Sequence, residues 1–172
     1  MPQGLKQNSS PIQISSKVVE TAANTFTSTE IDLTLNVLDQ EVFVITQVNL
    51  DIDAPDSVAG VTTATNASLS TTSRTGTGDI SDSNVVAAAS RIIVTNAAMT
   101  PDGGIPFDRE DPTFTALGED YIGICATNNM FVNLSGLNNG NAKECRVRVY
   151  GYRAIASASV YSALVNSELL SA

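Results

Sequence analysis

Histidine and tryptophan are both absent from this 172-residue chain, and cysteine occurs only twice. Without histidine there is no Ser-His-Asp triad, no Cys-His dyad and no zinc site of mixed cysteine and histidine ligands. Two cysteines are too few for a four-cysteine zinc site or a cysteine-held iron–sulfur cluster. These absences exclude the commonest catalytic centres, so we expect a structural or binding protein and not an enzyme.

Basic residues are scarce as well. The chain has 9 Lys+Arg against 18 Asp+Glu, for a formal net charge of −9. Binding to nucleic-acid backbones usually needs clustered Lys and Arg, and the first eleven residues contain only Lys6. We therefore expect no nucleic acid to be bound by the N-terminal arm, and we expect the acidic balance to favour solubility.

Long apolar runs are missing too. No stretch of 18 or more apolar residues is present, and the N-terminus has no charged segment followed by an apolar run. We therefore expect no transmembrane segment, no signal peptide and no membrane partner.

The length predicts one domain. Residues 1–11 are polar and contain Pro2, Gly4 and Pro11, which indicates a flexible N-terminal arm. This arm is either a disordered tail or a segment that reaches a neighbouring molecule. A single domain is expected over residues 12–172, including a C-terminal extension over 155–172.

Alternation of apolar and polar residues predicts strands over much of the chain. It starts at Ile12, returns over 26–37, and is longest over 41–53. In this last segment, even-numbered residues from Val42 to Ile52 are expected on one face. Phe43 and Ile45 make the first half apolar on both faces, so that half is expected to be covered on both sides.

Further strands are expected over 61–73, 85–95, 114–117, 121–127, 130–134 and 143–153. Helix is the alternative for 85–89. Residues 75–84 and 99–111 are expected to be irregular, and Asn139-Gly140 is typical of a type I′ hairpin turn. Apolar residues at helical spacing, from Val160 to Leu169, predict a short helix over about 159–170, with a strand extension as the alternative.

Together these elements predict an all-β, antiparallel β-sandwich of about eight strands, with jelly-roll or Greek-key connections and a short C-terminal helix or extension. The N-terminal arm, the strands across 12–154, the long Thr/Ser/Gly loops and the C-terminal extension resemble the single jelly-roll coat proteins of small non-enveloped viruses. The resemblance implies a homo-oligomer in a virion or other extracellular assembly.

Two groups of carboxylates are candidate metal ligands. One follows the longest strand and the other lies in the irregular region: Asp51, Asp53, Asp56, Asp108, Glu110 and Asp111. Calcium takes six to eight oxygen ligands from carboxylates and carbonyls, but neither group matches an EF-hand. Calcium is thus the one candidate cofactor, and solvated acidic loops are the alternative.

The last expected strand concentrates basic and aromatic side chains. Four of the nine basic residues lie over 143–153, and the candidate interface set is Arg146, Arg148, Tyr150, Tyr152 and Arg153. Arginine and tyrosine are favoured at protein interfaces, so we expect this strand to meet acidic loops of the same chain or of another copy.

The two cysteines, Cys125 and Cys145, both lie in apolar stretches. They are expected to be small buried side chains, with a cross-strand disulfide as the alternative.

Three functions follow from this reading. The first is a self-assembling structural subunit of viral capsid type. The second is a filament or pilus subunit joined by strand addition. The third is a calcium-dependent adhesion or glycan-binding domain, for which the scarcity of aromatic residues, 5% in all, is unfavourable.

Overall fold

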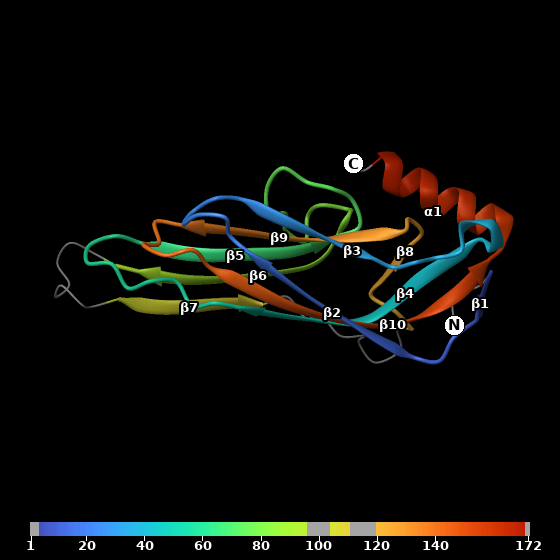
Figure 1. Cartoon of the computed structure of the whole chain (residues 1–172), viewed down its shortest axis with the longest axis horizontal. Helices are drawn as coiled ribbons and strands as arrows, with labels where there is room; N and C mark the ends of the chain where they lie inside the picture. The colour runs from blue at the N-terminus through green and yellow to red at the C-terminus, as the bar shows by residue number, and fades with distance from the viewer. Residues whose placement is uncertain (1–3, 96–103, 111–119, 171–172) are drawn as a thin grey trace.

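The computed structural model describes residues 4–95, 104–110 and 120–170, and these residues form two antiparallel sheets and one helix (Figure 1). The first sheet, sheet A, contains β1 (Leu5–Gln7), β2 (Ile12–Val19), β4 (Glu41–Ile52), β8 (Gly123–Cys125) and β10 (Glu144–Ala156). The second sheet, sheet B, contains β3 (Thr27–Asp32), β5 (Thr63–Ser70), β6 (Val85–Val94), β7 (Ile105–Glu110) and β9 (Asn129–Leu137).

The strand pairing is that of a jelly roll. When β1 and β7 are set aside, eight strands remain. They pair in nested order, the first with the last, the second with the second-to-last, and so on: β2 with β10, β3 with β9, β4 with β8, and β5 with β6. This nesting places β2, β10, β4 and β8 in one sheet and β3, β9, β5 and β6 in the other. The expected antiparallel β-sandwich with jelly-roll connections is confirmed.

The main core fills the space between the two sheets. Alternate residues of each strand point inward, as the period-two pattern requires. The largest fully buried side chains from this core include Phe43, Ile45, Ile52, Leu69, Met130 and Leu134.

A β-bulge divides the longest strand into two halves with opposite facing. Ile45 pairs with Gly151 and Gln47 pairs with Tyr150, so Thr46 is an additional residue in β4. Before the bulge, Phe43 and Ile45 face the core, and after it the even-numbered residues face the core. The expectation of one face for all even residues from Val42 to Ile52 was therefore wrong, because one inserted residue inverts the alternation.

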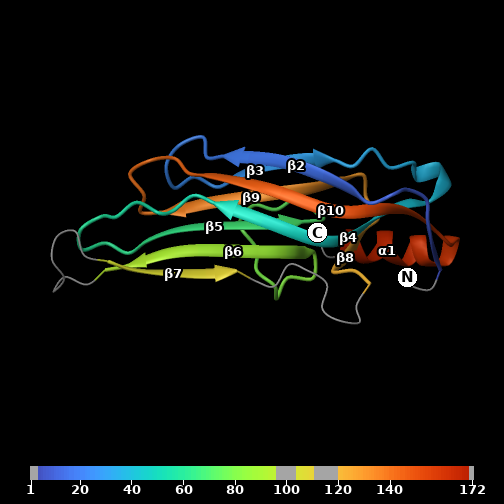
Figure 2. The same ribbon diagram turned by 90° about the horizontal axis from the view of Figure 1, so that it is seen from below.

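Helix α1 (Ala158–Leu170) covers the outer face of sheet A beside the first half of β4 (Figures 1 and 2). Val42 and Val44 point away from the main core and pack with Val160 and Leu164 of the helix. The predicted helix, and the predicted covering of this half of β4 on both faces, are both confirmed. Leu169 was expected in the apolar face but is 66% exposed.

The sequence predicted that Leu169 would be buried in this part of the helix, but Glu168 is the residue buried there. Its side chain is buried, and the carboxylate accepts hydrogen bonds from the backbone N–H groups of Ala126 (2.9 Å) and Thr127 (3.0 Å). These bonds fasten the last turn of α1 to the chain after β8. A carboxylate at this position was not expected, because its two backbone donors are about 40 residues away in sequence.

Part of the expected N-terminal arm is a strand of the sandwich. Residues Leu5 to Gln7 form β1, which pairs with Ala154 to Ala156 at the end of β10. Leu5 is only 9% exposed and joins the apolar cluster under α1. The expectation of a free arm is thus corrected for residues 5–7, since the end of β10 offers an open edge and the helix offers apolar surface.

Two local expectations also need correction. Residues 105–110 lie in the region expected to be irregular, yet they form β7 at the edge of sheet B, where Pro106 is tolerated. The loop 138–143 is longer than a type I′ turn, and only Asn138 among its residues has a positive φ (56°). The short strand expected over 114–117 lies outside the described residues.

Two further connections complete the sandwich, and the strand expected over 61–73 ends at Ser70. A short turn, η1 (Val37–Asp39), joins β3 to β4, with Asn36 as its N-cap. The loop over 71–84 joins β5 to β6 and folds back on the outer face of sheet B. Among the described residues no helix is long and apolar enough to cross a membrane.

Candidate functional site

Strand β10 presents the predicted interface residues on two different faces. Arg146, Arg148, Tyr150 and Tyr152 lie on the outer face of sheet A, alternating with core residues. The helix covers Tyr152, whereas Arg146 and Arg148 are exposed. Arg153 has the opposite facing, and its guanidinium donates to the carbonyl of Leu33 (3.0 Å) and to Thr34 Oγ1 (2.9 Å).

The predicted contact between this strand and acidic residues exists within the chain. Arg146 forms ion pairs with Asp51 (3.4 Å) and Asp53 (3.7 Å) and also with Glu144. The Arg146 side chain is about half exposed, so each pair contributes little to stability. Two carboxylates that the sequence marked as calcium ligands therefore serve as partners of an arginine.

Asp56 is held more tightly than the other carboxylates. It pairs with Lys143, whose side chain is 7% exposed, and it accepts backbone hydrogen bonds from Gly140 (2.9 Å) and Asn141 (3.0 Å). The hydrogen bond from Lys143 is the main cause that lowers the pKa of Asp56. Asp56 thereby fixes the loop between β9 and β10, and its oxygens are occupied by donors.

The second carboxylate group does not assemble with the first. Asp108 lies 3.5 Å from Arg91 of the neighbouring strand, Glu110 ends β7, and Asp111 lies outside the described residues. In residues 4–95, 104–110 and 120–170, no three Cys, Asp or Glu side chains are close enough together to hold a metal ion. The expected calcium ligands are therefore not brought together.

Cys125 and Cys145 are both buried and free. Cys125 pairs with Phe43 and Cys145 pairs with Ile52, so nine positions of β4 separate them, or about 30 Å. The disulfide alternative is wrong, because bonded cysteines need Cα atoms within about 7 Å. Burial raises the pKa of each thiol to about 12, so neither cysteine is a ready nucleophile.

The uncovered half of the outer face of sheet A is polar. A shallow groove of about 640 Å³ crosses β2, β10 and β4 there, and Arg148 lines it between Ser15 and Asn49. These two cross-strand neighbours are uncharged. Arg148 is thus a positive side chain of this face with no carboxylate directly opposite it on either adjoining strand.

An apolar patch, formed by Ile92, Val94, Ile105 and Phe107, lies at the edge of sheet B. The register pairs Ile92 with Phe107 and Val94 with Ile105, which puts all four side chains on the same, outer face. Phe107 is 55% exposed, Ile105 49% and Val94 40%. Contiguous exposed apolar side chains of this kind mark contact surfaces.

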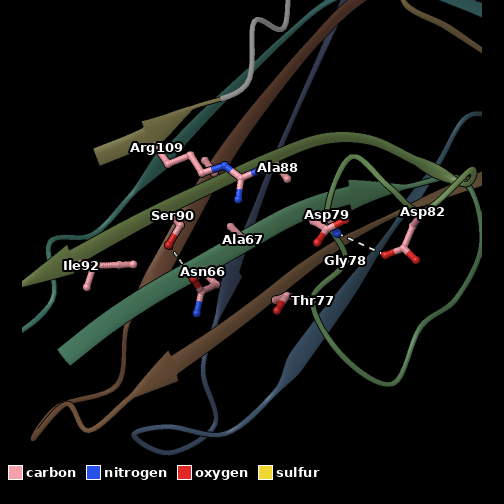
Figure 3. Close-up of a pocket in the computed structure, with 11 residues that line it drawn as sticks. Asn66, Ala67, Thr77, Gly78, Asp79, Asp82, Ala88, Ser90, Ile92 and Arg109 are labelled. Atoms are coloured by element: carbon pink, nitrogen blue, oxygen red, sulfur yellow. Dashed lines mark hydrogen bonds between the residues drawn. The ribbon is translucent and has the colours of Figure 1, made fainter. Parts of the chain in front are cut away.

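A pocket of about 400 Å³ lies next to this patch, between the outer face of sheet B and the loop 71–84 (Figure 3). Asn66 of β5, Ser90 of β6 and Arg109 of β7 line it from the sheet. Thr77 and Asp79 line it from the loop. Ser90 donates to Asn66 Oδ1 (2.6 Å), which leaves the Asn66 amide group to face the pocket.

This pocket was not predicted from the sequence. Its residues come from three strands and a loop, spread over 44 positions from Asn66 to Arg109, and one of those strands was expected to be irregular. The one local signal is the pair Gly76 and Gly78, which indicated a loop without showing where it folds.

No family model matches this chain, and no curated protein matches it. Among solved structures it is similar to a chain of "Desmodium yellow mottle tymovirus", with 10% identity and a TM-score of 0.31. It is also similar to a chain of the empty head of turnip yellow mosaic virus, with 12% identity and a TM-score of 0.26. Each comparison covers 91% of this chain and 86% of the other chain.

A third likeness, to a structure of infectious bursal disease virus Gt strain, has 12% identity and a TM-score of 0.14. It covers 91% of this chain but 41% of that one. All three likenesses are distant, and all three are to virus structures.

Proposed function

We propose that this chain is a structural subunit of viral coat type that assembles with further copies of itself. The observation that carries the proposal is the apolar patch of Ile92, Val94, Ile105 and Phe107. Burying the exposed halves of Ile105 and Phe107 against another copy contributes about 1 kcal/mol for each side chain. Copies that meet through this patch would lie side by side at the β7 edge of sheet B.

A second copy is the occupant that suits this patch best. The patch is small, so one contact is weak, and repetition of that contact around a closed assembly makes it strong. The jelly-roll fold supports the same proposal, because this architecture recurs in viral capsids. A coat-type role would place the chain in a virion.

Features of the candidate residues favour a structural role over an enzymatic one. The thiols have raised pKa values, and the carboxylates Asp51, Asp53 and Asp56 are engaged by Arg146 and Lys143. Residues 5–7 occupy an edge of their own sheet, which disfavours a filament in which that segment is donated to a neighbour.

The test is the size of the protein in solution. Wild type is expected to form large particles in sedimentation velocity and negative-stain electron microscopy. Phe107→Ser is expected to shift the protein to monomers, because it removes the largest side chain of the patch. Leu38→Ser is the matched control, since Leu38 is 93% exposed on η1, away from the patch.

Two results would contradict the proposal. One is a wild-type protein that stays monomeric at high concentration. The other is a Phe107→Ser variant that assembles as wild type does.

A further inference from the structure

We propose that the pocket between loop 71–84 and sheet B binds a single sugar unit. This inference goes beyond assembly, because it gives the chain a small-molecule ligand at a site that adjoins the apolar patch and shares Ile92 with it. Asn66, Asp79 and Arg109 are the residues that would recognise the ligand, from two strands and the loop (Figure 3).

The size of the pocket fits this ligand. A volume of about 400 Å³ lies at the lower end of the range for small-molecule pockets, roughly 300–1,000 Å³. The floor includes the outward-facing side chains of Ala88 and Ile92, whereas the side chains of Ala67 and Ala89, which also border it, belong to the main core. A sugar ring has an apolar C–H face that such a floor can contact without an aromatic platform.

The charges of the pocket exclude simpler ligands. Asp79 on the loop wall would repel a phosphate or sulfate, and Arg109 on the strand wall would repel a metal cation, whereas the charge of Asp82 is paired with Arg74. A ligand that suits both walls is close to neutral and offers donors and acceptors on adjacent atoms. Neighbouring hydroxyl groups of a sugar do this, since each donates to a carboxylate and accepts from a guanidinium or amide.

The wall that carries Asp79 is already fixed in place. The backbone N–H of Gly78 donates to Ser68 Oγ (3.1 Å) on the buried sheet surface. Arg74 binds both Asp82 (2.9 Å) and the side chain of Asn84 (2.8 Å) within the loop. A pocket with a preorganised wall loses less conformational entropy when a ligand binds.

Gly78 is essential to this geometry. A Cβ atom there would lie 2.6 Å from Val85 Cγ2 and 2.8 Å from Asp82 Oδ2, so a larger residue would push the loop away. Asp79 is positioned in turn by Ser81, whose N–H donates to Oδ1 (2.8 Å).

The experiment is saturation-transfer difference NMR with named sugars as probes. Glucose, galactose, mannose, fucose, N-acetylglucosamine, N-acetylgalactosamine and N-acetylneuraminic acid are each added at about 10 mM, well above a millimolar Kd. At least one sugar is expected to receive magnetisation from the wild-type protein. The last sugar tests whether Arg109 also selects a carboxylate.

Variants decide whether the signal comes from this pocket. Asp79→Ala and Asn66→Ala are each expected to reduce it at least about fivefold, the loss of roughly one hydrogen bond to a charged or amide group. The matched controls are Asp39→Ala on η1 and Asn49→Ala on the outer face of sheet A, which are expected to leave the signal unchanged. Absence of any signal from all seven sugars overturns the proposal, as does an equal signal in the pocket variants.

Discussion

Gly151 shows how closely β10 and its neighbour β4, both in sheet A, approach each other at the β-bulge. A Cβ atom at this position would lie 2.2 Å from the carbonyl oxygen of Val44 and 2.8 Å from the ring of Phe43. Neither can move away cheaply, because one is backbone of the paired strand and the other is a fully buried ring. Glycine is therefore required at position 151 because there is no room for a Cβ atom, and not because the backbone adopts a conformation that only glycine favours.

Gly151→Ala is expected to lower the free energy of unfolding by about 3 kcal/mol, the upper range for overpacking a core. Urea denaturation followed by circular dichroism measures this. Gly76→Ala is the control, because nothing lies within 4 Å of the added Cβ, and its effect is expected to stay within about 0.5 kcal/mol. Equal stabilities of the two variants would contradict the packing described at the bulge.

Glu168 makes the docking of α1 dependent on pH. Burial is the largest cause that raises the pKa of Glu168 above its usual range, and it outweighs the hydrogen bonds from Ala126 and Thr127. The folded protein therefore holds the proton more firmly than the unfolded chain does. The stability from this group is present at low pH and declines as pH rises through the raised pKa.

Glu168→Gln is expected to remove this dependence, because glutamine does not titrate. The measurement is the difference in unfolding free energy between wild type and Glu168→Gln, at several values from about pH 4 to pH 7. Wild type is expected to lose stability relative to the variant as pH rises, and taking the difference cancels the other carboxylates. Parallel curves for the two proteins would show that Glu168 is not buried in solution.

At the scale of elements, the regular parts of the chain were predictable because their signal is local. The helix over about 159–170 was found as Ala158–Leu170, and the half of β4 with Phe43 and Ile45 was expected to be covered on both sides. The spacing of apolar residues predicts which side chains are buried and where an element ends. It does not show an inserted residue such as Thr46, because a bulge is defined by the partner strand.

Three features escaped sequence reasoning because they depend on distant partners. The strand β7 carries Pro106 and charged residues, and only the edge of β6 makes it regular. The β9–β10 loop takes its shape from Asp56, more than 80 positions away. The candidate sugar pocket needs both β7 and the fold of loop 71–84, so no single segment could indicate it.

The pairing of strand β1 with the end of β10 can be tested in solution. Leu5 is buried under α1, whereas Gln7, two residues along, is exposed. Leu5→Ala is expected to lower the unfolding free energy by about 2 kcal/mol, and Gln7→Ala to change it by less than about 0.5 kcal/mol. Leu5→Ala should also speed amide exchange over residues 154–156. A Leu5→Ala variant as stable as Gln7→Ala would mean that this segment leaves the sheet in solution.

At the scale of the whole molecule, net charge and apolar contact oppose each other. Each copy carries a formal charge of −9, so copies repel one another at long range as they approach. The apolar patch at the β7 edge acts only on contact and does not depend on salt in this way. The two ways of joining copies, through this patch or through ion pairs to Arg148 on sheet A, therefore respond to salt in opposite directions.

Raising sodium chloride from about 20 mM to about 500 mM is expected to strengthen assembly, because salt shortens the Debye length from roughly 20 Å to a few Å. Sedimentation velocity at one protein concentration measures the fraction of large particles, and Phe107→Ser is expected to remain monomeric at every salt concentration. If assembly weakened with salt, ionic contacts would dominate. The contact surface would then be the groove around Arg148, and Arg148→Ala would abolish assembly where Phe107→Ser did not.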